Sequence, residues 1–406
     1  MHGCILSCVW VALSCGVVAA PPGNPVQALQ AYLKQPVGQR KPATEDFRKL
    51  TLSLKQAEQI SGLLWTDHVA HLHKERAKEM QAKVIRHGEL SMRFEYVVYG
   101  DKPKDGRSLY ISMHGGGNAP ARVNDGQWEN QKRLYRPKEG IYLAPRAPTN
   151  TWNLWHQGHI DPMFMRLIEN LVALQEVNPN RVYLMGYSAG GDGVYQVAPR
   201  MADAFAAAAM MAGHPNETSP VGLRNLPFAI HVGKNDRGFN RNRVAAEWSD
   251  QLAALRKADP KGYVHHVQIH AGRGHWMNRE DAVAVEWMAR HIRNPLPRQI
   301  VWRQDDVLHS DFYWLSLSAG QAKAREEIRA KAVGQYIELT GPTGRRVTVN
   351  LKDELVDLEQ PVIITANGKE QYRGRVPRTI GTLLETLKER RDQEYLFPAR
   401  VEVILP

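Results

Sequence analysis

The sequence predicts an α/β fold: a doubly wound, mostly parallel sheet with an N-terminal helical arm and a small C-terminal β-sandwich-like domain. Between residues 89 and 295, short apolar runs rich in strand-forming residues alternate with longer segments of helical periodicity, as in a parallel sheet covered by helices. After Asn294-Pro-Leu-Pro297, strand-like runs are instead separated by turn signals such as Asn367-Gly368. Before residue 89, apolar residues recur at helical spacing.

The first residues form a candidate export signal. An apolar run from Cys4 to Ala20 ends in small residues, like the hydrophobic region and cleavage site of a signal peptide. We expect residues 1–20 to be a leader and the mature protein to be secreted or periplasmic. An uncleaved leader that anchors the protein in a membrane is the alternative. All three cysteines, including Cys8 and Cys15, lie in this run, so the mature chain would have no disulfide and no zinc-thiolate site.

The chain is basic, with a formal net charge of +11. Such a charge favours acidic surfaces or polyanions as partners. Lys and Arg are nevertheless spread along the whole chain, without a long basic block or a nucleic-acid-reading motif. We therefore expect a solvated basic surface, no nucleic-acid partner, no bound metal, and no stable membrane insertion once the leader is removed.

Residues 24–88 are expected to form the helical arm. The segment 25–34 is a short helix candidate, and 52–86 carries apolar residues at helical spacing. His68 and His71 would share a face of this second helix, but no zinc-binding signature such as H-E-x-x-H accompanies them. A solvated helix face is the preferred interpretation.

The segment 89–295 is expected to be the catalytic domain. Strands are predicted at 94–99, 108–113, 141–144, 182–185, 206–211, 227–232 and 263–270. Helices are predicted at 161–177, with Asp161 as N-cap, and at 241–257 and 279–292. Reactive groups of such sheets lie at the carboxyl ends of the strands. Four candidates each follow a predicted strand: His114, Ser188, Asp236 and His275.

Ser188 is the candidate nucleophile. It stands in Gly186-Tyr-Ser-Ala-Gly190, a G-x-S-x-G pattern that exposes a serine hydroxyl on a tight strand-to-helix turn. The serine needs a base, and His275 is the best candidate because its glycine-rich loop follows a strand. Asp236 would fix the tautomer of that base, which gives the chain order Ser…Asp…His. Asp192 is a weaker candidate acid, because its position at a helix N-terminus already accounts for its charge.

Backbone amides are expected to form the oxyanion hole. Ala189 follows the nucleophile, and Gly115 or Gly116 of His114-Gly-Gly-Gly117 would supply the second N–H. A crowded aromatic loop at 151–159 follows a strand on the active side. Its rings could line the bottom of a pocket for an acyl group or a sugar. The alternative is that they pack between domains. Candidate pocket residues are His114, Tyr187, Trp152, Trp155, His156, His159 and Trp276.

Together these motifs resemble the α/β-hydrolase superfamily over roughly residues 90–295. Within it, the chain is similar to bacterial esterases related to dienelactone hydrolases and polyhydroxybutyrate depolymerases, and to the catalytic domain of prolyl oligopeptidases. The resemblance implies acyl transfer to Ser188 and hydrolysis by water that His275 activates, without a cofactor. The chain departs from these relatives in having no β-propeller before this segment, a serine where some dienelactone hydrolases have cysteine, and an additional β-rich domain.

We therefore expect an exported serine hydrolase acting on a small-molecule or polymeric carboxylic ester. A serine peptidase of prolyl-oligopeptidase type and a non-catalytic protein that binds a glycan or a surface are the alternatives. The domain 298–406 could itself bind substrate or a surface. Its predicted strands are 299–302, 312–318, 336–339, 346–350, 361–365, 371–376 and 401–405, with one helix at 379–392.

Overall fold

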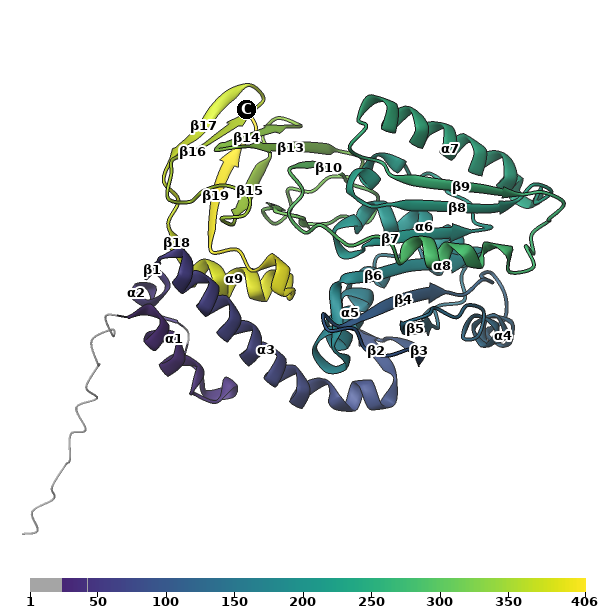
Figure 1. Cartoon of the computed structure of the whole chain (residues 1–406), viewed down its shortest axis with the longest axis horizontal. Helices are drawn as coiled ribbons and strands as arrows, with labels where there is room; N and C mark the ends of the chain where they lie inside the picture. Colours follow the sequence, from purple (N-terminus) through teal and green to yellow (C-terminus); the bar gives the residue numbers. More distant parts are fainter. Residues whose placement is uncertain (1–23, 42) are drawn as a thin grey trace, which may run out of the picture.

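A computed structural model describes residues 24–41 and 43–406. The leader predicted over residues 1–20 lies outside this range. Within it, no helix is both long enough and apolar enough to cross a membrane. Figure 1 shows three parts: a large sheet with its helices, a β-rich C-terminal domain beside it, and N-terminal helices that extend along both.

The main sheet has eight strands in the order β2-β3-β5-β4-β6-β7-β8-β9. The β2–β3 and β3–β5 pairs are antiparallel and all the other pairs are parallel, which confirms the predicted mostly parallel sheet. The strands are β2 (Val84–His87), β3 (Leu90–Tyr99), β4 (Arg107–Met113), β5 (Gly140–Pro145), β6 (Val177–Tyr187), β7 (Ala207–Met211), β8 (Phe228–Gly233) and β9 (His265–His270).

Helices cover both faces of this sheet. They are α4 (Ala121–Gln131), α5 (Ile160–Gln175), α6 (Ala189–Arg200), α7 (Arg241–Ala258) and the short α8 (Val283–Met288). Successive strand residues point to opposite faces. Ile111 and Leu184 accordingly belong to one buried apolar cluster, and their neighbours Tyr110 and Tyr183 to another. Burial on both faces explains why these strands are continuous apolar runs.

The N-terminal arm contains α1 (Pro25–Leu33), α2 (Glu45–Arg48) and the long α3 (Leu54–Ala82). A capping box between Ser53 and Gln56 begins α3. The helix predicted to reach residue 86 ends earlier, because Lys83 adopts a left-handed conformation (φ 52°) and the next residues pair with β3 as strand β2. Figure 1 shows α3 extending from the C-terminal domain to the main sheet, so this helix braces the two parts.

The C-terminal region is β-rich and contains several sheets, as predicted. A five-stranded sheet has the order β10-β13-β14-β16-β17, and a four-stranded sheet has the order β11-β12-β15-β19. Strand β13 was not predicted, because charged residues alternate along it with one isoleucine and two alanines, a weak apolar pattern. The elements are β10 (Gln299–Arg303), β11 (Asp311–Phe312), β12 (Leu315–Leu317), β13 (Glu327–Val333), β14 (Tyr336–Thr340), β15 (Arg346–Leu351), β16 (Val362–Ala366), β17 (Lys369–Gly374), β18 (Arg378–Thr379), α9 (Ile380–Arg390) and β19 (Ala399–Ile404).

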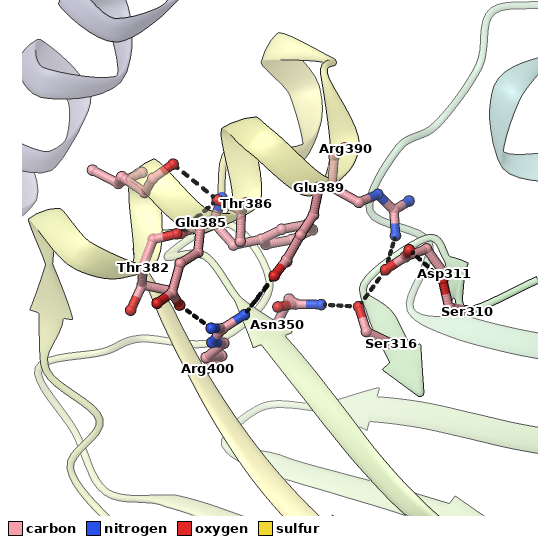
Figure 2. Close-up of polar contacts among 12 residues, drawn as sticks. Ser310, Asp311, Ser316, Asn350, Thr382, Glu385, Thr386, Glu389, Arg390 and Arg400 are labelled. Atoms are coloured by element: carbon pink, nitrogen blue, oxygen red, sulfur yellow. Dashed lines mark hydrogen bonds and ion pairs between the residues drawn. The ribbon is translucent and has the colours of Figure 1, made fainter. Parts of the chain in front are cut away.

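Polar contacts fasten α9 to its surroundings. Figure 2 shows Arg400 of β19 directed toward Glu385 and Glu389 of the helix. Glu385 also pairs with Arg48 of the N-terminal arm, and β1 (Thr51–Leu52) pairs with β18. Below the helix, Asn350 donates a hydrogen bond of 2.9 Å to the hydroxyl of Ser316. The arm, α9 and the four-stranded sheet are therefore joined by side chains that bind one another.

The C-terminal domain packs against the edge of the main sheet at which the strands begin. Asp203, shortly before β7, accepts hydrogen bonds of 2.9 Å from Arg390 and, through its carbonyl, from Tyr395. Arg224, shortly before β8, donates to the carbonyl of Gln299 over 3.2 Å. The carboxyl ends of the parallel strands lie at the opposite edge. The domain is thus attached away from the edge where a reactive site is expected.

One contact at this junction corrects a prediction. Helix α5 begins at Ile160 with His159 as its N-cap, so Asp161 lies inside the first turn. The buried Asp161 carboxylate accepts hydrogen bonds from Arg200 at 2.6 Å and from His309 of the C-terminal domain at 2.8 Å. These two partners hold the carboxylate against the domain junction, where it cannot cap the helix.

Candidate active site

Ser188 lies at the turn between β6 and α6. Its backbone has φ 58° and ψ −121°, a strained conformation for a residue with a side chain. A Cβ on Gly186 would lie 2.2 Å from the carbonyl oxygen of Gly190, and a Cβ on Gly190 would lie 2.1 Å from that of Met113. Both positions therefore require glycine. The turn leaves the serine hydroxyl at the carboxyl end of the sheet.

Ser188, His275 and Asp236 form one hydrogen-bonded chain. Nε2 of His275 lies 3.0 Å from Oγ of Ser188. Nδ1 of the same ring lies 2.8 Å from Oδ2 of Asp236. Asp236 is 3% exposed, whereas the His275 side chain is 44% exposed. With Nδ1 donating to the carboxylate, Nε2 is free to accept the serine proton.

The loops that carry the acid and the base are bound to each other. The backbone N–H of Asn235 donates to the carbonyl of Arg273 over 2.8 Å. A Cβ on Gly233 would lie 2.0 Å from the carbonyl oxygen of Gly274, so the two backbones could not approach this closely with any other residue there. This contact fixes the separation between Asp236 and His275.

The predicted oxyanion-hole residues surround Ser188. Ala189 is the first residue of α6, so its N–H has no acceptor within the helix. A Cβ on Gly115 would be 3.1 Å from Cβ of Ser188. Gly116 has φ +109°, and a Cβ there would lie 2.3 Å from Oδ1 of Asn124. Asn124, on α4, accepts a hydrogen bond of 2.8 Å from the N–H of Gly117 and so braces the glycine loop.

His114 has a structural role rather than the predicted place in the pocket. The ring is fully buried, and burial lowers its pKa to about 4. The neutral ring donates from Nδ1 to the carbonyl of Gly115 over 2.6 Å and accepts at Nε2 from the N–H of Ala147 over 3.1 Å. His114 therefore fixes the orientation of the Gly115 peptide group, which is part of the glycine loop.

A cavity of about 650 Å³ opens beside Ser188. Helix α4 and the residues after it form one wall, and Tyr187 and Trp276 belong to another. The lining, drawn wholly from the main domain, contains two arginines and, within the described chain, no carboxylate. The lining residues are Gly115, Gly116, Val123, Gln127, Asn130, Gln131, Arg133, Leu134, Tyr187, Ser188, His275, Trp276 and Arg279.

The aromatic loop at 151–159 does not line this cavity within the described structure, so that part of the pocket prediction is wrong. Trp155 is fully buried and donates from its indole to the carbonyl of His114 over 2.9 Å. His156 is also buried, and burial lowers its pKa to about 4. Trp152 is exposed and packs edge-on against His156, while His159 occupies the N-cap position of α5 without a capping hydrogen bond from its side chain. Trp155 and His156 therefore fill space inside the domain, and Trp152 stays at its surface.

Two parts of the site were not predicted. Helix α4 was missed because Asn, Asp and Gly interrupt it, and Val123 and Trp128 are its only large apolar residues. Asn124 was therefore missed as well. Asp192 was assigned to the helix dipole, but its carboxylate accepts a hydrogen bond of 2.6 Å from the N–H of His214. Burial raises the pKa of Asp192 to about 6 and outweighs that hydrogen bond.

The segment that contains the three hydrogen-bonded residues also matches a known sequence family. Residues 137–291 match the dienelactone hydrolase family. This segment contains Ser188, Asp236 and His275 and ends before the C-terminal domain. This segment is therefore similar to the dienelactone hydrolase family, and with the strand order of the main sheet the fold is a dienelactone hydrolase-like α/β-hydrolase fold. The family is one of hydrolases.

Solved structures of esterases are similar to about half of the chain. A thermostable esterase has 18% identity and a TM-score of 0.40, covering 52% of this chain and 62% of its own. A poly(3-hydroxybutyrate) depolymerase from Bordetella parapertussis has 16% identity and a TM-score of 0.40, covering 54% of this chain and 94% of its own. A feruloyl esterase module from Clostridium thermocellum has 15% identity and a TM-score of 0.37, covering 51% and 86%. No protein with a curated description matches the sequence.

Proposed function

We propose that the protein is a serine hydrolase that cleaves carboxylic esters through an acyl-enzyme on Ser188. The observation that carries this proposal is the hydrogen-bonded chain from Ser188 through His275 to Asp236, with separations of 3.0 and 2.8 Å. A serine hydroxyl is a weak nucleophile until a base accepts its proton. The open cavity beside Ser188 gives an ester access to that hydroxyl.

The reaction would proceed in two halves. His275 takes the serine proton while Oγ attacks the ester carbonyl, and the resulting oxyanion is stabilised by the N–H of Ala189 and an N–H of the glycine loop. The C–O bond to the alcohol then breaks, and the imidazolium returns its proton to the leaving alkoxide. In the second half His275 takes a proton from water, the hydroxide attacks the acyl carbon, and the acid leaves as Ser188 recovers its proton.

The positive charge of the cavity favours substrates that carry a negative group near the ester. Arg133 and Arg279 line the cavity, and within residues 24–41 and 43–406 no ion pair or side-chain hydrogen bond joins either guanidinium to another residue. Their guanidinium groups can bind a carboxylate with two hydrogen bonds. We therefore expect kcat/KM to be higher for an ester that carries a carboxylate than for a neutral ester of the same size.

Ester turnover by matched variants tests the proposal. Purified wild-type protein is expected to hydrolyse short p-nitrophenyl esters, and Ser188→Ala is expected to lose at least about 10³-fold in kcat while keeping its melting temperature. A panel of acetylated and feruloylated sugars and of carboxylate-bearing esters would then define the substrate. Equal turnover by the two proteins would refute the assignment, and cleavage of peptide amides in preference to esters would identify a peptidase.

We further propose that the protein is exported, on the basis of the apolar run from Cys4 to Ala20 alone. Export predicts that the mature protein begins just after this run and contains no cysteine. N-terminal sequencing of protein recovered from the medium or periplasm of its host checks both points. A mature protein that begins at Met1 would contradict cleavage of the leader.

A further inference from the structure

We propose that Tyr187 is a positioning residue that holds the base at a fixed distance from the nucleophile; this rests on the proposed serine hydrolase function. Tyr187 is covalently attached to Ser188 and ends strand β6. Its hydroxyl reaches the loop that carries His275. A single side chain thus connects the backbone of the nucleophile to the backbone of the base.

Two hydrogen bonds make this connection. The Tyr187 hydroxyl donates to the carbonyl of His275 over 2.6 Å and accepts from the N–H of Met277 over 3.1 Å. Among the described residues, these are the only side-chain hydrogen bonds to the backbone of residues 274–278. The hydroxyl therefore binds both sides of Trp276, which lies between these two residues in the sequence.

The surroundings of Tyr187 favour this role over direct substrate binding. The side chain is 8% exposed, and both hydrogen-bonding functions of its hydroxyl are used by the loop. Burial raises its pKa well above the ordinary value, so the hydroxyl keeps the proton that it donates. Its ring also packs against His275 and Trp276, with centroids 6.0 and 5.7 Å away.

The loop depends on such an anchor because it has no regular structure of its own. Residues 271–279 lie between β9 and a short 3₁₀ turn, and His275 and Trp276 are exposed. Without the Tyr187 hydroxyl, a partly buried carbonyl and a buried N–H would lose their partners. Within the described structure, the backbone of residues 275–277 would then be held only by the backbone hydrogen bonds at Arg273 and Glu280. Displacement of a catalytic group by about 1 Å can reduce the rate about 10²-fold.

Tyr187→Phe is the direct test, because it removes the hydroxyl and keeps the ring. Tyr183→Phe is a matched control on the same strand: Tyr183 is buried, and its hydroxyl likewise donates to a backbone carbonyl, that of His291, over 3.0 Å. Tyr187→Phe is expected to lower kcat about 10²-fold with KM unchanged, and to slow organophosphonate labelling of Ser188 equally. Tyr183→Phe is expected to retain both rates and to melt at a similar or lower temperature.

Hydrogen exchange provides a readout that does not depend on activity. Faster exchange of the Met277 amide in Tyr187→Phe, with the main sheet unchanged, is expected. A wild-type protein that is inert to esters and organophosphonates would refute the proposed function, while the exchange result would still decide whether Tyr187 fixes the loop. Equal exchange in variant and wild type, a kcat unchanged in Tyr187→Phe, or a rise in KM alone would overturn the positioning role.

Discussion

The two edges of the main sheet use the same kinds of side chain in different ways. At the edge where the strands begin, Arg390 of the C-terminal domain pairs with Asp203. Asp161, which pairs with Arg200, also accepts a hydrogen bond from His309 of that domain. At the edge where the strands end, Ser188 has a strained backbone and His275 is 44% exposed. Charges that bind one another hold the C-terminal domain in place, whereas strain and exposed polar groups characterise the candidate active site.

Two buried carboxylates illustrate the difference. Burial alone would raise the pKa of Asp161, but Arg200 and His309 more than offset that effect and hold its pKa below the ordinary value. Asp192, close to Ser188, accepts a backbone hydrogen bond instead, and burial raises its pKa to about 6. Asp161, a buried acid with a guanidinium partner, therefore stabilises the junction. Asp192, a buried acid without such a partner, makes the free energy of unfolding depend on pH.

The largest expected effect is a loss of stability at the junction between the main domain and the C-terminal domain. Asp161→Ala would leave the buried Arg200 guanidinium without its partner, and breaking such a buried pair typically costs about 3–5 kcal/mol. We expect the free energy of unfolding, measured with urea, to fall by that amount while the kcat of the folded protein stays unchanged.

Glu247→Ala is the matched control, because it breaks the exposed pair with Arg243 on α7. Such surface pairs contribute about 0.3–0.5 kcal/mol. A loss of kcat in Asp161→Ala at a temperature where the protein is fully folded would mean that the two edges are not independent, contrary to the comparison.

A smaller effect, on kcat, is expected from a substitution in the glycine loop. Gly116→Ala would place a Cβ 2.3 Å from Oδ1 of Asn124 at a backbone φ of +109°. The displaced loop would weaken the proposed oxyanion hole, and loss of one donor typically costs about 10²–10³-fold in kcat. Gly126→Ala on α4 is the control, because its Cβ would meet no atom within 4 Å. Steady-state kinetics that showed equal kcat for both variants would exclude the glycine loop from catalysis.

The smallest expected effect is the pH dependence of stability that Asp192 causes. Because its folded pKa of about 6 lies above the ordinary 3.8, folding favours the protonated acid. This contribution is fully present below about pH 3.8 and is lost as the pH rises through about 6. Asp192→Asn mimics the protonated acid, so the free energy of unfolding of this variant should exceed that of the wild type by an amount that grows from near zero at about pH 3 to about 3 kcal/mol at about pH 7. Parallel stability–pH curves for variant and wild type would contradict this assignment.

The sequence predicted most of the main sheet because its strands are buried on both faces and therefore appear as apolar runs. The same property placed Ser188, Asp236 and His275 after strands, where the structure brings them together. Side-chain placement in the irregular loops was less predictable. The aromatic residues at 151–159 suggested a pocket, but Trp155 is buried against His114 and Trp152 lies at the surface. The polar helix α4 lines the cavity instead, and it has no apolar stripe to reveal it.

The same limit applies to tertiary contacts. Nothing local in the sequence distinguishes Asp161 as a helix cap from Asp161 as the partner of Arg200 and His309, because His309 belongs to a different domain. Strand β13 was missed because its buried face holds one large apolar residue, Ile328, and two alanines, and charged residues alternate with them. The local sequence pattern predicts helices and strands. Contacts between distant segments determine which partners the polar residues bind.

The most direct test of the central claim, that Ser188 is an activated nucleophile at one edge of the sheet, is covalent labelling. Wild-type protein is incubated with a fluorophosphonate, and the modified residue is located by peptide mass spectrometry. We predict a single adduct on Ser188, and no adduct in Ser188→Ala or His275→Ala proteins that melt at the wild-type temperature. No adduct on the wild-type protein, an adduct on another residue, or equal labelling of His275→Ala would contradict the claim.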